Sequence, residues 1–225
     1  MKNLICGIDE AGRGPVFGPL ILAAAVFDSP GREELRKLKV KDSKRIAKKR
    51  RDKLEPEIKE IACEWHTIAI TPYDIDLIRK NYSLNVIEAM YAAKLILKLK
   101  TNPAKIIIDA ADAVPERYKN NIINFVKEKN ENFSTPVISE HKADDNYIDV
   151  SAASILAKVE RDRIIEKLKD KYGEIGSGYP SDSKTKNFLK KLMANSGELP
   201  DFVRKSWNTV KNNKNKISQA KLMEF

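Results

Sequence analysis

Cysteine and histidine are scarce in this chain. Its 225 residues include two cysteines, Cys6 and Cys63, and two histidines. The cysteines lie far apart, each within an apolar stretch, so neither a disulfide framework nor a cysteine-based zinc site is indicated. A reducing, cytoplasmic location fits this pattern best.

Long apolar runs are also missing. No uninterrupted apolar segment approaches the roughly 20 residues that span a membrane, and the N-terminal run is too short for a signal peptide. We therefore expect a soluble protein without a membrane partner.

Two nucleotide-binding motifs are absent as well. No G-x-x-x-x-G-K-[ST] sequence occurs, so a P-loop is not predicted. Gly12, Gly14 and Gly18 follow the spacing G-x-G-x-x-x-G, which differs from the dinucleotide-binding spacing. Pro15 also disfavours the helix that must follow such a loop. These features argue against a dinucleotide-dependent oxidoreductase.

Positive charge, by contrast, is abundant. The chain has 42 Lys and Arg against 32 Asp and Glu, a formal net charge of +10. This surplus favours a polyanionic partner such as nucleic acid, although lysines that only keep a protein soluble are an equal alternative. The same two alternatives apply to the basic run from Lys44 to Lys53, which is either a phosphate track or a solvated helix face.

Hydrophobic spacing predicts alternating strands and helices. Strands are expected at 4–8, 20–27, 63–70, 106–108 and 136–139, and helices at 44–60, 83–100, 115–131 and 150–172, with a further helix opening at Thr71-Pro72. The alternation predicts an α/β fold with a mixed central sheet flanked by helices and a β-hairpin at its start. We expect a main domain over 1–175 and a small helical extension over 176–225.

Acidic residues stand where the predicted elements meet loops. Asp9 and Glu10 follow the first strand, Asp109 follows three isoleucines, and Asp144 precedes the last long helix. Oxygen ligands without convergent His or Cys suit Mg²⁺ or Mn²⁺. Two such ions can activate water and stabilise the leaving oxygen in phosphodiester hydrolysis. A nucleic-acid-binding module without catalysis would explain the positive charge but not these acids.

The pair Asp9 and Glu10 requires a special backbone. Side chains alternate between the faces of a strand, so both carboxylates can serve one site only if the chain leaves regular strand geometry there. Gly12 and Gly14 allow such a departure. We therefore expect the first strand to end before Asp9.

Several segments together resemble the ribonuclease HII family, or type 2 ribonuclease H, in its archaeal form. The matches occur in family order over most of the chain: Gly-Ile-Asp-Glu-Ala-Gly-Arg-Gly-Pro-Val (7–16), Val-Lys-Asp-Ser-Lys (40–44), Asp-Ala-Ala-Asp (109–112), His-Lys-Ala-Asp (141–144), Ser-Ala-Ala-Ser-Ile-Leu-Ala-Lys-Val (151–159) and Gly-Ser-Gly-Tyr-Pro-Ser-Asp (176–182).

This resemblance implies a ribonuclease H-like catalytic domain over 1–175. It implies a metal-dependent endonuclease that cleaves the RNA strand of RNA/DNA hybrids and cuts at single ribonucleotides in duplex DNA, leaving 3′-hydroxyl and 5′-phosphate ends. The cofactor would be Mg²⁺ or Mn²⁺, with two ions in the presence of substrate. The catalytic, metal-binding residues would be Asp9, Glu10, Asp109 and Asp144. Asp112 competes with Asp109 for this role, and Asp145 competes with Asp144.

The resemblance also assigns substrate contacts. Gly12, Arg13 and Gly14 would recognise the ribose 2′-hydroxyl that distinguishes RNA from DNA. Tyr179 would stack on the neighbouring sugar, although the residue taken alone is better explained as a loop aromatic covering apolar surface. Lys44 would lie near the scissile phosphate. The extension would contribute to substrate binding, with a duplex-contacting surface at Arg204, Lys205 and Trp207.

The last residues carry a separate motif. Gln219, Leu222 and Phe225 have the spacing Gln-x-x-Leu-x-x-Phe, which resembles sliding-clamp binding peptides. A plain amphipathic helix end explains the same spacing equally well. The sequence therefore predicts an enzyme that acts as a monomer on RNA/DNA hybrids and ribonucleotide-containing duplexes, with a sliding clamp as a further candidate partner.

Overall fold

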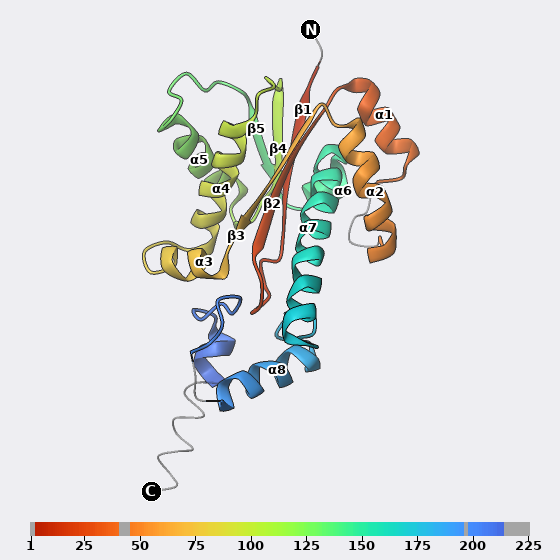
Figure 1. Cartoon of the computed structure of the whole chain (residues 1–225). Helices are drawn as coiled ribbons and strands as arrows, with labels where there is room; N and C mark the ends of the chain where they lie inside the picture. The colour runs from red at the N-terminus through yellow and green to blue at the C-terminus, as the bar shows by residue number, and fades with distance from the viewer. Residues whose placement is uncertain (1–2, 41–45, 196–197, 214–225) are drawn as a thin grey trace, which may run out of the picture. The chain divides into compact units, whose positions relative to one another are not determined.

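The computed structural model describes residues 3–40, 46–195 and 198–213 (Figure 1). Contacts divide the chain into two compact units. Unit 1 comprises Met1–Ala11, Ile21–Ala69 and Tyr82–Glu160, and unit 2 comprises Gly12–Leu20, Ile70–Asn81 and Arg161–Phe225. Lys44 and the C-terminal residues Gln219, Leu222 and Phe225 lie outside the described residues.

Unit 1 is built on a five-stranded sheet with the order β3-β2-β1-β4-β5. The strands are β1 (Ile5–Ala11), β2 (Leu20–Phe27), β3 (Glu64–Ile70), β4 (Lys105–Asp109) and β5 (Val137–Glu140). β1 pairs antiparallel with β2 and parallel with β4, and β4 pairs parallel with β5. The predicted mixed sheet and its opening hairpin are confirmed.

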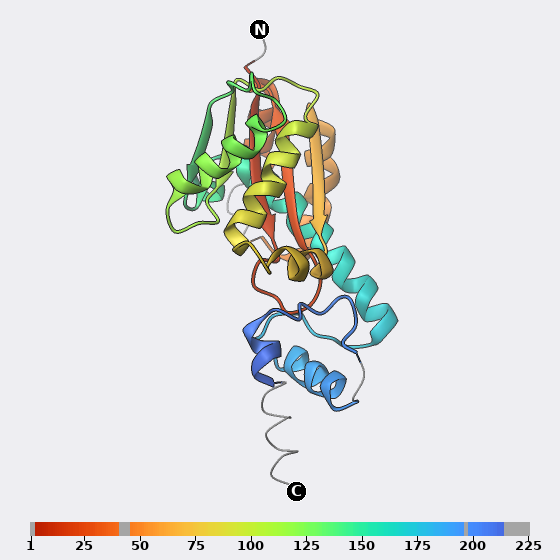
Figure 2. The same cartoon turned by 90° about the vertical axis from the view of Figure 1, so that its left-hand side faces the viewer.

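Helices cover both faces of this sheet. α4 (Leu84–Lys98) and α5 (Pro115–Lys127) lie on one face, and α1 (Ser29–Lys37), α2 (Lys48–Ile61) and the first half of α7 (Ile148–Tyr172) lie on the other (Figures 1 and 2). Every residue of β2 is buried, and so are the three isoleucines of β4. Continuous apolar strands are expected where both faces of a sheet are covered.

The start of α7 packs directly against β1 at Gly7. A Cβ at Gly7 would lie 2.2 Å from the backbone carbonyl carbon of Asp149, so only glycine permits this approach. The short helix α6 (Ala143–Asn146) precedes α7 and contacts β4. The close crossing at Gly7 brings side chains of α7 to the same strand that carries Asp9.

Unit 2 has its own apolar core. α3 (Pro72–Ile78) and α8 (Ser183–Ala194) belong to it. Phe17 packs edge-to-face on Phe202 with ring centroids 5.6 Å apart, and the other buried core residues are Val16, Ile175, Leu189, Leu199, Val203 and Val210. The carboxylate of Asp76 in α3 accepts the backbone N–H groups of residues 205 and 206 at 2.6 and 2.9 Å. Asp76 therefore fixes the backbone at residues 205 and 206.

None of the helices in the described part of the chain has the length and apolar character needed to span a bilayer.

Candidate functional site

β1 continues through the acidic pair, so the expectation that regular strand geometry ends before Asp9 is wrong. Asp9 pairs with Ala23, Glu10 with Leu22, and the register stays regular to Ala11. Antiparallel pairing with β2 holds these residues extended. Successive strand side chains project to opposite faces, and the structure accordingly buries Asp9 and leaves Glu10 partly exposed.

Asp9 and Asp109 form the acidic centre of unit 1. Burial and the negative charge of Asp109 raise the pKa of Asp9 to about 7, although its side chain also interacts with Ser154 and Lys158. Asp9 is only 5% exposed, so water screens this repulsion poorly. The neighbouring strands β1 and β4 thus carry two carboxylates that repel each other, one within β1 and one at the end of β4.

A backbone hydrogen bond from α6 to Asp109 brings Asp144 close to this pair. The carboxylate of Asp109 accepts the N–H of Ala143 at 2.7 Å, and Asp144 is the following residue. Lys142, just before, has a φ of 59°, a left-handed conformation that is uncommon for residues other than glycine. The hydrogen bond from Ala143 therefore fixes a strained turn, and Asp144 is 1% exposed there.

The donor set fits a hard divalent cation. Asp9, Asp109 and Asp144 offer only carboxylate oxygens, and a bound cation would offset both the burial and the Asp109 charge that raise the pKa of Asp9. Across residues 3–40, 46–195 and 198–213, however, no three His, Cys, Asp or Glu side chains already stand close enough together to hold a metal ion. The structure thus brings two of the four acids into electrostatic contact, with Asp144 beside them and Glu10 on the opposite strand face.

Two residues of α7 belong to this centre although the sequence analysis assigned them no role. Ser154 forms a side-chain hydrogen bond with Asp9, and the charge of Lys158 favours the ionised form of Asp9. They stand four residues apart, which places them on one helix face. The available signal was this spacing, which places a serine and a lysine on the same face of the helix.

Asp112, the rival of Asp109, is engaged in other contacts. Its carboxylate accepts hydrogen bonds from Arg117 Nε at 3.0 Å, from Asn85 at 2.9 Å and from the Val114 N–H at 2.9 Å. Hydrogen bonding and ion pairing with Arg117 hold the pKa of Asp112 well below its ordinary value. Asp112 therefore fastens the start of α5 to α4, which favours Asp109 as the metal ligand. Asp145 lies beside Asp144 in α6 and is half-buried.

In unit 2, the turn from Gly12 to Gly14 is anchored through its carbonyl groups. The Arg204 guanidinium donates to the carbonyls of Gly12 at 2.6 Å, Arg13 at 3.0 Å and Gly18 at 3.0 Å. Trp207 Nε1 donates to the Gly14 carbonyl at 3.2 Å. All three carbonyls of the turn are thus held by one C-terminal segment.

This arrangement corrects the expectation that Arg204 contacts a duplex. Its side chain is 0% exposed, so it cannot reach a bound nucleic acid. It acts on the turn from within, while Lys205 and Trp207 remain partly exposed. Gly12 itself has a φ of 91°, and a Cβ there would lie 2.6 Å from the side chain of Arg161. Gly12 is therefore required by both conformation and space.

Tyr179 lies beside the same turn. A Cβ at Gly14 would be 3.6 Å from the Tyr179 ring, and the ring is 40% exposed. Arg161 approaches the ring to 5.2 Å and donates to the Ser177 carbonyl at 3.0 Å. The preceding Gly178 carbonyl accepts the Val16 N–H at 2.7 Å. Unit 2 therefore brings together the glycine turn and the aromatic residue that the sequence analysis assigned to substrate recognition.

Comparison with known proteins places this arrangement in a family. The sequence profile of ribonuclease HII matches residues 6–210. Ribonuclease HII of Thermococcus onnurineus is 46% identical over 215 residues, 96% of this chain and 92% of the relative.

Two solved structures share the fold. Ribonuclease H2 from Pyrococcus horikoshii superposes with a TM-score of 0.87 at 42% identity and covers 96% of this chain and 99% of its own. The ribonuclease HII in a complex with PCNA from Archaeoglobus fulgidus gives a TM-score of 0.82 at 40% identity, covering 93% of this chain and 96% of its own.

The mixed sheet flanked by helices is thus a ribonuclease H-like fold, and the protein is a metal-dependent ribonuclease H, a hydrolase. Within that class the chain belongs to the ribonuclease HII family.

Proposed function

We propose that this protein is an endonuclease that hydrolyses the RNA strand of RNA/DNA hybrids and cuts at single ribonucleotides embedded in duplex DNA. The products would carry 3′-hydroxyl and 5′-phosphate ends. The observation that carries the proposal is the anchored turn, in which Arg204 and Trp207 bind the carbonyls of Gly12, Arg13 and Gly14. A turn held through its carbonyls can offer a fixed backbone to a ribose without reorganising.

The acidic centre would supply the metal site. Asp9, Glu10, Asp109 and Asp144 would hold Mg²⁺ or Mn²⁺, two ions when substrate is bound, and such ions lower the pKa of water and stabilise the leaving oxygen. Ser154 holds the Asp9 carboxylate in place, and Lys158 offsets part of its charge. Because the Glu10 side chain projects from the opposite face of β1, a metal ion would have to contact Glu10 from that face.

Substrate choice would lie with the glycine turn. Gly14 is exposed, so a sugar can approach its backbone closely, and the Tyr179 ring beside it offers a stacking surface. Lys44 would complete the site near the scissile phosphate. Residues 176–225 would form an extension of the catalytic domain over 1–175 that contributes to substrate binding, through Tyr179 and the anchoring residues Arg204 and Trp207.

The test compares three duplexes of the same sequence that differ only in how many nucleotides of one strand are ribonucleotides. Duplexes with a single ribonucleotide, with a full RNA strand and with DNA alone are incubated with the full chain, with and without Mg²⁺ or Mn²⁺. We expect cutting of the first two, only with metal. Cutting without metal, or cutting of the all-DNA duplex, would reject the proposal.

Variants locate the chemistry. Asp9→Asn removes a metal ligand and should reduce the cleavage rate by about a thousandfold, because a bound ion is worth several kcal/mol in the transition state. Asp52→Asn removes an exposed acid on α2 and serves as the matched control, with an unchanged rate. Undiminished cutting by Asp9→Asn would disprove the assignment of the metal site. Binding without cutting under any metal would favour a recognition module instead.

The same chemistry would serve the removal of misincorporated ribonucleotides and of RNA primers during DNA replication and repair in the cytoplasm. A sliding clamp is the second proposed partner. The Archaeoglobus fulgidus relative was solved as a PCNA complex, and this chain ends in the motif Gln219, Leu222 and Phe225. Clamp contact through one helical turn would use the two apolar side chains.

Clamp binding is tested with the cognate sliding clamp immobilised on a sensor. Deletion of 219–225 and the variant Phe225→Ala should both abolish binding, whereas Lys221→Ala should preserve it. Unchanged affinity after the deletion would remove the motif from consideration.

A further inference from the structure

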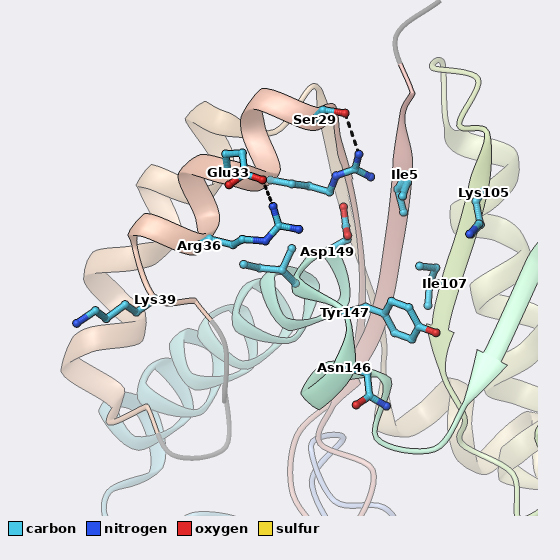
Figure 3. Close-up of a pocket in the computed structure, with 12 residues that line it drawn as sticks. Ile5, Ser29, Glu33, Arg36, Lys39, Lys105, Ile107, Asn146, Tyr147 and Asp149 are labelled. Carbon is cyan, nitrogen blue, oxygen red and sulfur yellow. Dashed lines mark hydrogen bonds and ion pairs between the residues drawn. The ribbon is translucent and has the colours of Figure 1, made fainter.

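A cleft of about 710 Å³ opens at the end of the sheet away from the acidic centre, within unit 1 (Figure 3). We call it the β1/α1 cleft, and its lining residues are Ile5, Ser29, Arg32, Glu33, Arg36, Lys39, Lys105, Ile107, Asn146, Tyr147, Ile148 and Asp149. Ile5 pairs with Lys105 at the start of β1 and β4. Asp9 lies four residues further along β1, about 13 Å from Ile5. The cleft extends to Asn146 at the end of α6, and neither Asp9, Asp109 nor Asp144 lines it.

Positive charge dominates the polar wall of this cleft. Four of its lining residues are basic and two are acidic. Arg36 forms an ion pair with Glu33, whereas the hydrogen bond recorded for Arg32 in the described residues goes to the Ser29 hydroxyl at 3.0 Å. The charge of Arg32 also acts on the nearby Asp149 carboxylate, yet that carboxylate keeps an oxygen without a hydrogen bond within the described part of the chain. The guanidinium therefore keeps donors for an anion, and it binds phosphate in a forked geometry.

The opposite wall is apolar and aromatic. Ile5 and Ile107 lie on the strands, and Tyr147 extends its ring alongside Ile107 (Figure 3). The Tyr147 hydroxyl donates to Glu140 Oε1 at 2.9 Å, which fixes the ring. A flat, apolar group could pack on this surface. A duplex backbone would gain nothing from it, because sugars and phosphates are polar.

A hydrogen-bond acceptor stands between the two walls. Asp149 is 3% exposed, and its Oδ1 atom is buried without a hydrogen-bond partner among the described residues. Figure 3 shows this carboxylate between α1 and Ile5. Its position is fixed, because the backbone of Asp149 packs directly on Gly7. A buried acceptor without a donor is costly, and a ligand hydroxyl or amino group would satisfy it.

We propose that the β1/α1 cleft binds a nucleoside monophosphate. The phosphate would pair with Arg32, the base would pack on Tyr147 and Ile107, and a ribose hydroxyl or base amino group would donate to Asp149. The volume lies within the range of roughly 300 to 1,000 Å³ typical of small-molecule sites. Double-stranded nucleic acid is too wide to enter such a cleft.

The test titrates the full chain with adenosine 5′-monophosphate, inorganic phosphate and adenosine by calorimetry, in buffer with a chelator. Without divalent ions the acidic centre repels phosphate, so any binding reports the cleft and is independent of the proposed nuclease activity. We expect saturable binding of the monophosphate, with weaker binding of each fragment. No saturation up to about 10 mM, equivalent to roughly −3 kcal/mol, would overturn the proposal.

Variants separate the contacts. Arg32→Ala should weaken monophosphate binding by about tenfold or more, because hydrogen bonds to charged groups are worth about 1.5 to 3 kcal/mol. Tyr147→Leu should weaken the monophosphate but not inorganic phosphate, and Tyr147→Phe should restore the loss. Lys37→Gln is the matched control. It removes one positive charge from an exposed position on α1 outside the lining of the cleft, so both affinity and melting temperature should be retained.

Two outcomes would refute the role of the cleft directly. Equal losses in Arg32→Ala and Lys37→Gln would mean that net charge alone attracts the phosphate. If Arg32→Ala instead weakens only the binding of a ribonucleotide-containing duplex, while the monophosphate never binds, the cleft belongs to the nucleic-acid surface and holds no nucleotide.

Discussion

Replacing Arg204 with lysine should loosen the glycine turn without removing the charge. The guanidinium makes three hydrogen bonds to the carbonyls of residues 12, 13 and 18. Hydrogen bonds to charged groups contribute about 1.5 to 3 kcal/mol each, and an unpaired buried carbonyl costs a similar amount. Lysine carries one ammonium and cannot form the forked arrangement, so about two of the bonds are lost.

We therefore expect Arg204→Lys to lower the free energy of unfolding by about 3 kcal/mol and Arg204→Met by about 5 kcal/mol. The second figure equals the whole stability of many domains, so the lysine variant is the informative one. Urea unfolding at neutral pH measures both. Lys190→Met removes an exposed cation from α8 and should change the unfolding free energy by less than about 0.5 kcal/mol.

The functional consequence follows from the same contacts. A looser turn should raise KM for a duplex with one ribonucleotide and leave kcat nearly unchanged, because the acidic centre is untouched by the substitution. The cleavage assay is run well below the melting temperature of the variant. Unfolding of Arg204→Lys within about 0.5 kcal/mol of the parent would refute the anchoring argument. A stability loss with unchanged KM would show that the anchor supports the fold but not recognition.

The remaining predictions concern acidic residues of unit 1. Asp109→Asn should abolish cleavage without lowering the free energy of unfolding, since it relieves repulsion with a buried carboxylate. Asp112→Asn should retain cleavage but lower the free energy of unfolding by about 2 kcal/mol, because it weakens the pair with Arg117. Equal losses of activity in the two variants would contradict this. Burial raises the pKa of Glu64, but hydrogen bonds from residues 100, 101 and 66 outweigh it and lower the pKa to about 2. The stability that Glu64 contributes over Glu64→Gln, about 3 kcal/mol at pH 7, should vanish as pH falls from about 4.5 to 2, and a pH-independent gap would refute it. Burial raises the pKa of Asp149 to about 6, despite the opposing charges of two arginines on α1. The stability that Asp149 contributes is therefore fully present below about pH 4 and is lost as the pH rises through 6. The free energy of unfolding of Asp149→Asn should exceed that of the parent by about 2 kcal/mol at pH 8 but not at pH 4. Urea unfolding at the two pH values measures this difference.

The sheet could be predicted from sequence because its signals are local. The isoleucines of β4 and the apolar run of β2 are strong strand formers bounded by turns. Helix α1 was missed, although Asp28 accepts the Gly31 N–H as an N-cap and Pro30 stands in the first turn. Helix α6 was missed because it is four residues long. Short helices depend on tertiary contacts, here the bond from Ala143 to Asp109.

Some features of the candidate site could also be predicted from the sequence, and others could not. The proximity of Asp9 and Asp109 could be expected because both follow apolar runs that form neighbouring strands. The end of β1 could not be predicted, since its last pairs with β2 join residues ten or more positions apart. Arg204 was expected on a duplex-contacting surface because the family resemblance implied such a surface there. Its burial follows from three carbonyls about 190 residues earlier in the chain, which no local pattern contains.

The covalent chain connects Asp9, the proposed metal ligand, with the glycine turn proposed to select the substrate. The first segment of unit 1 ends at Ala11 and the first segment of unit 2 begins at Gly12, so a boundary between the units falls inside the acidic and glycine-rich segment. Two residues separate Asp9 from Gly12, and three peptide units span at most about 11 Å. Pairing with β2 fixes Asp9 on one side, and Arg204 fixes Gly12 on the other. Under the proposed function, this covalent link would limit how far a phosphate bound near Asp9 can lie from a ribose bound at the turn. Because this limit is covalent, insertion of a single residue after Ala11 should uncouple ribonucleotide selection from cutting even if both units remain folded.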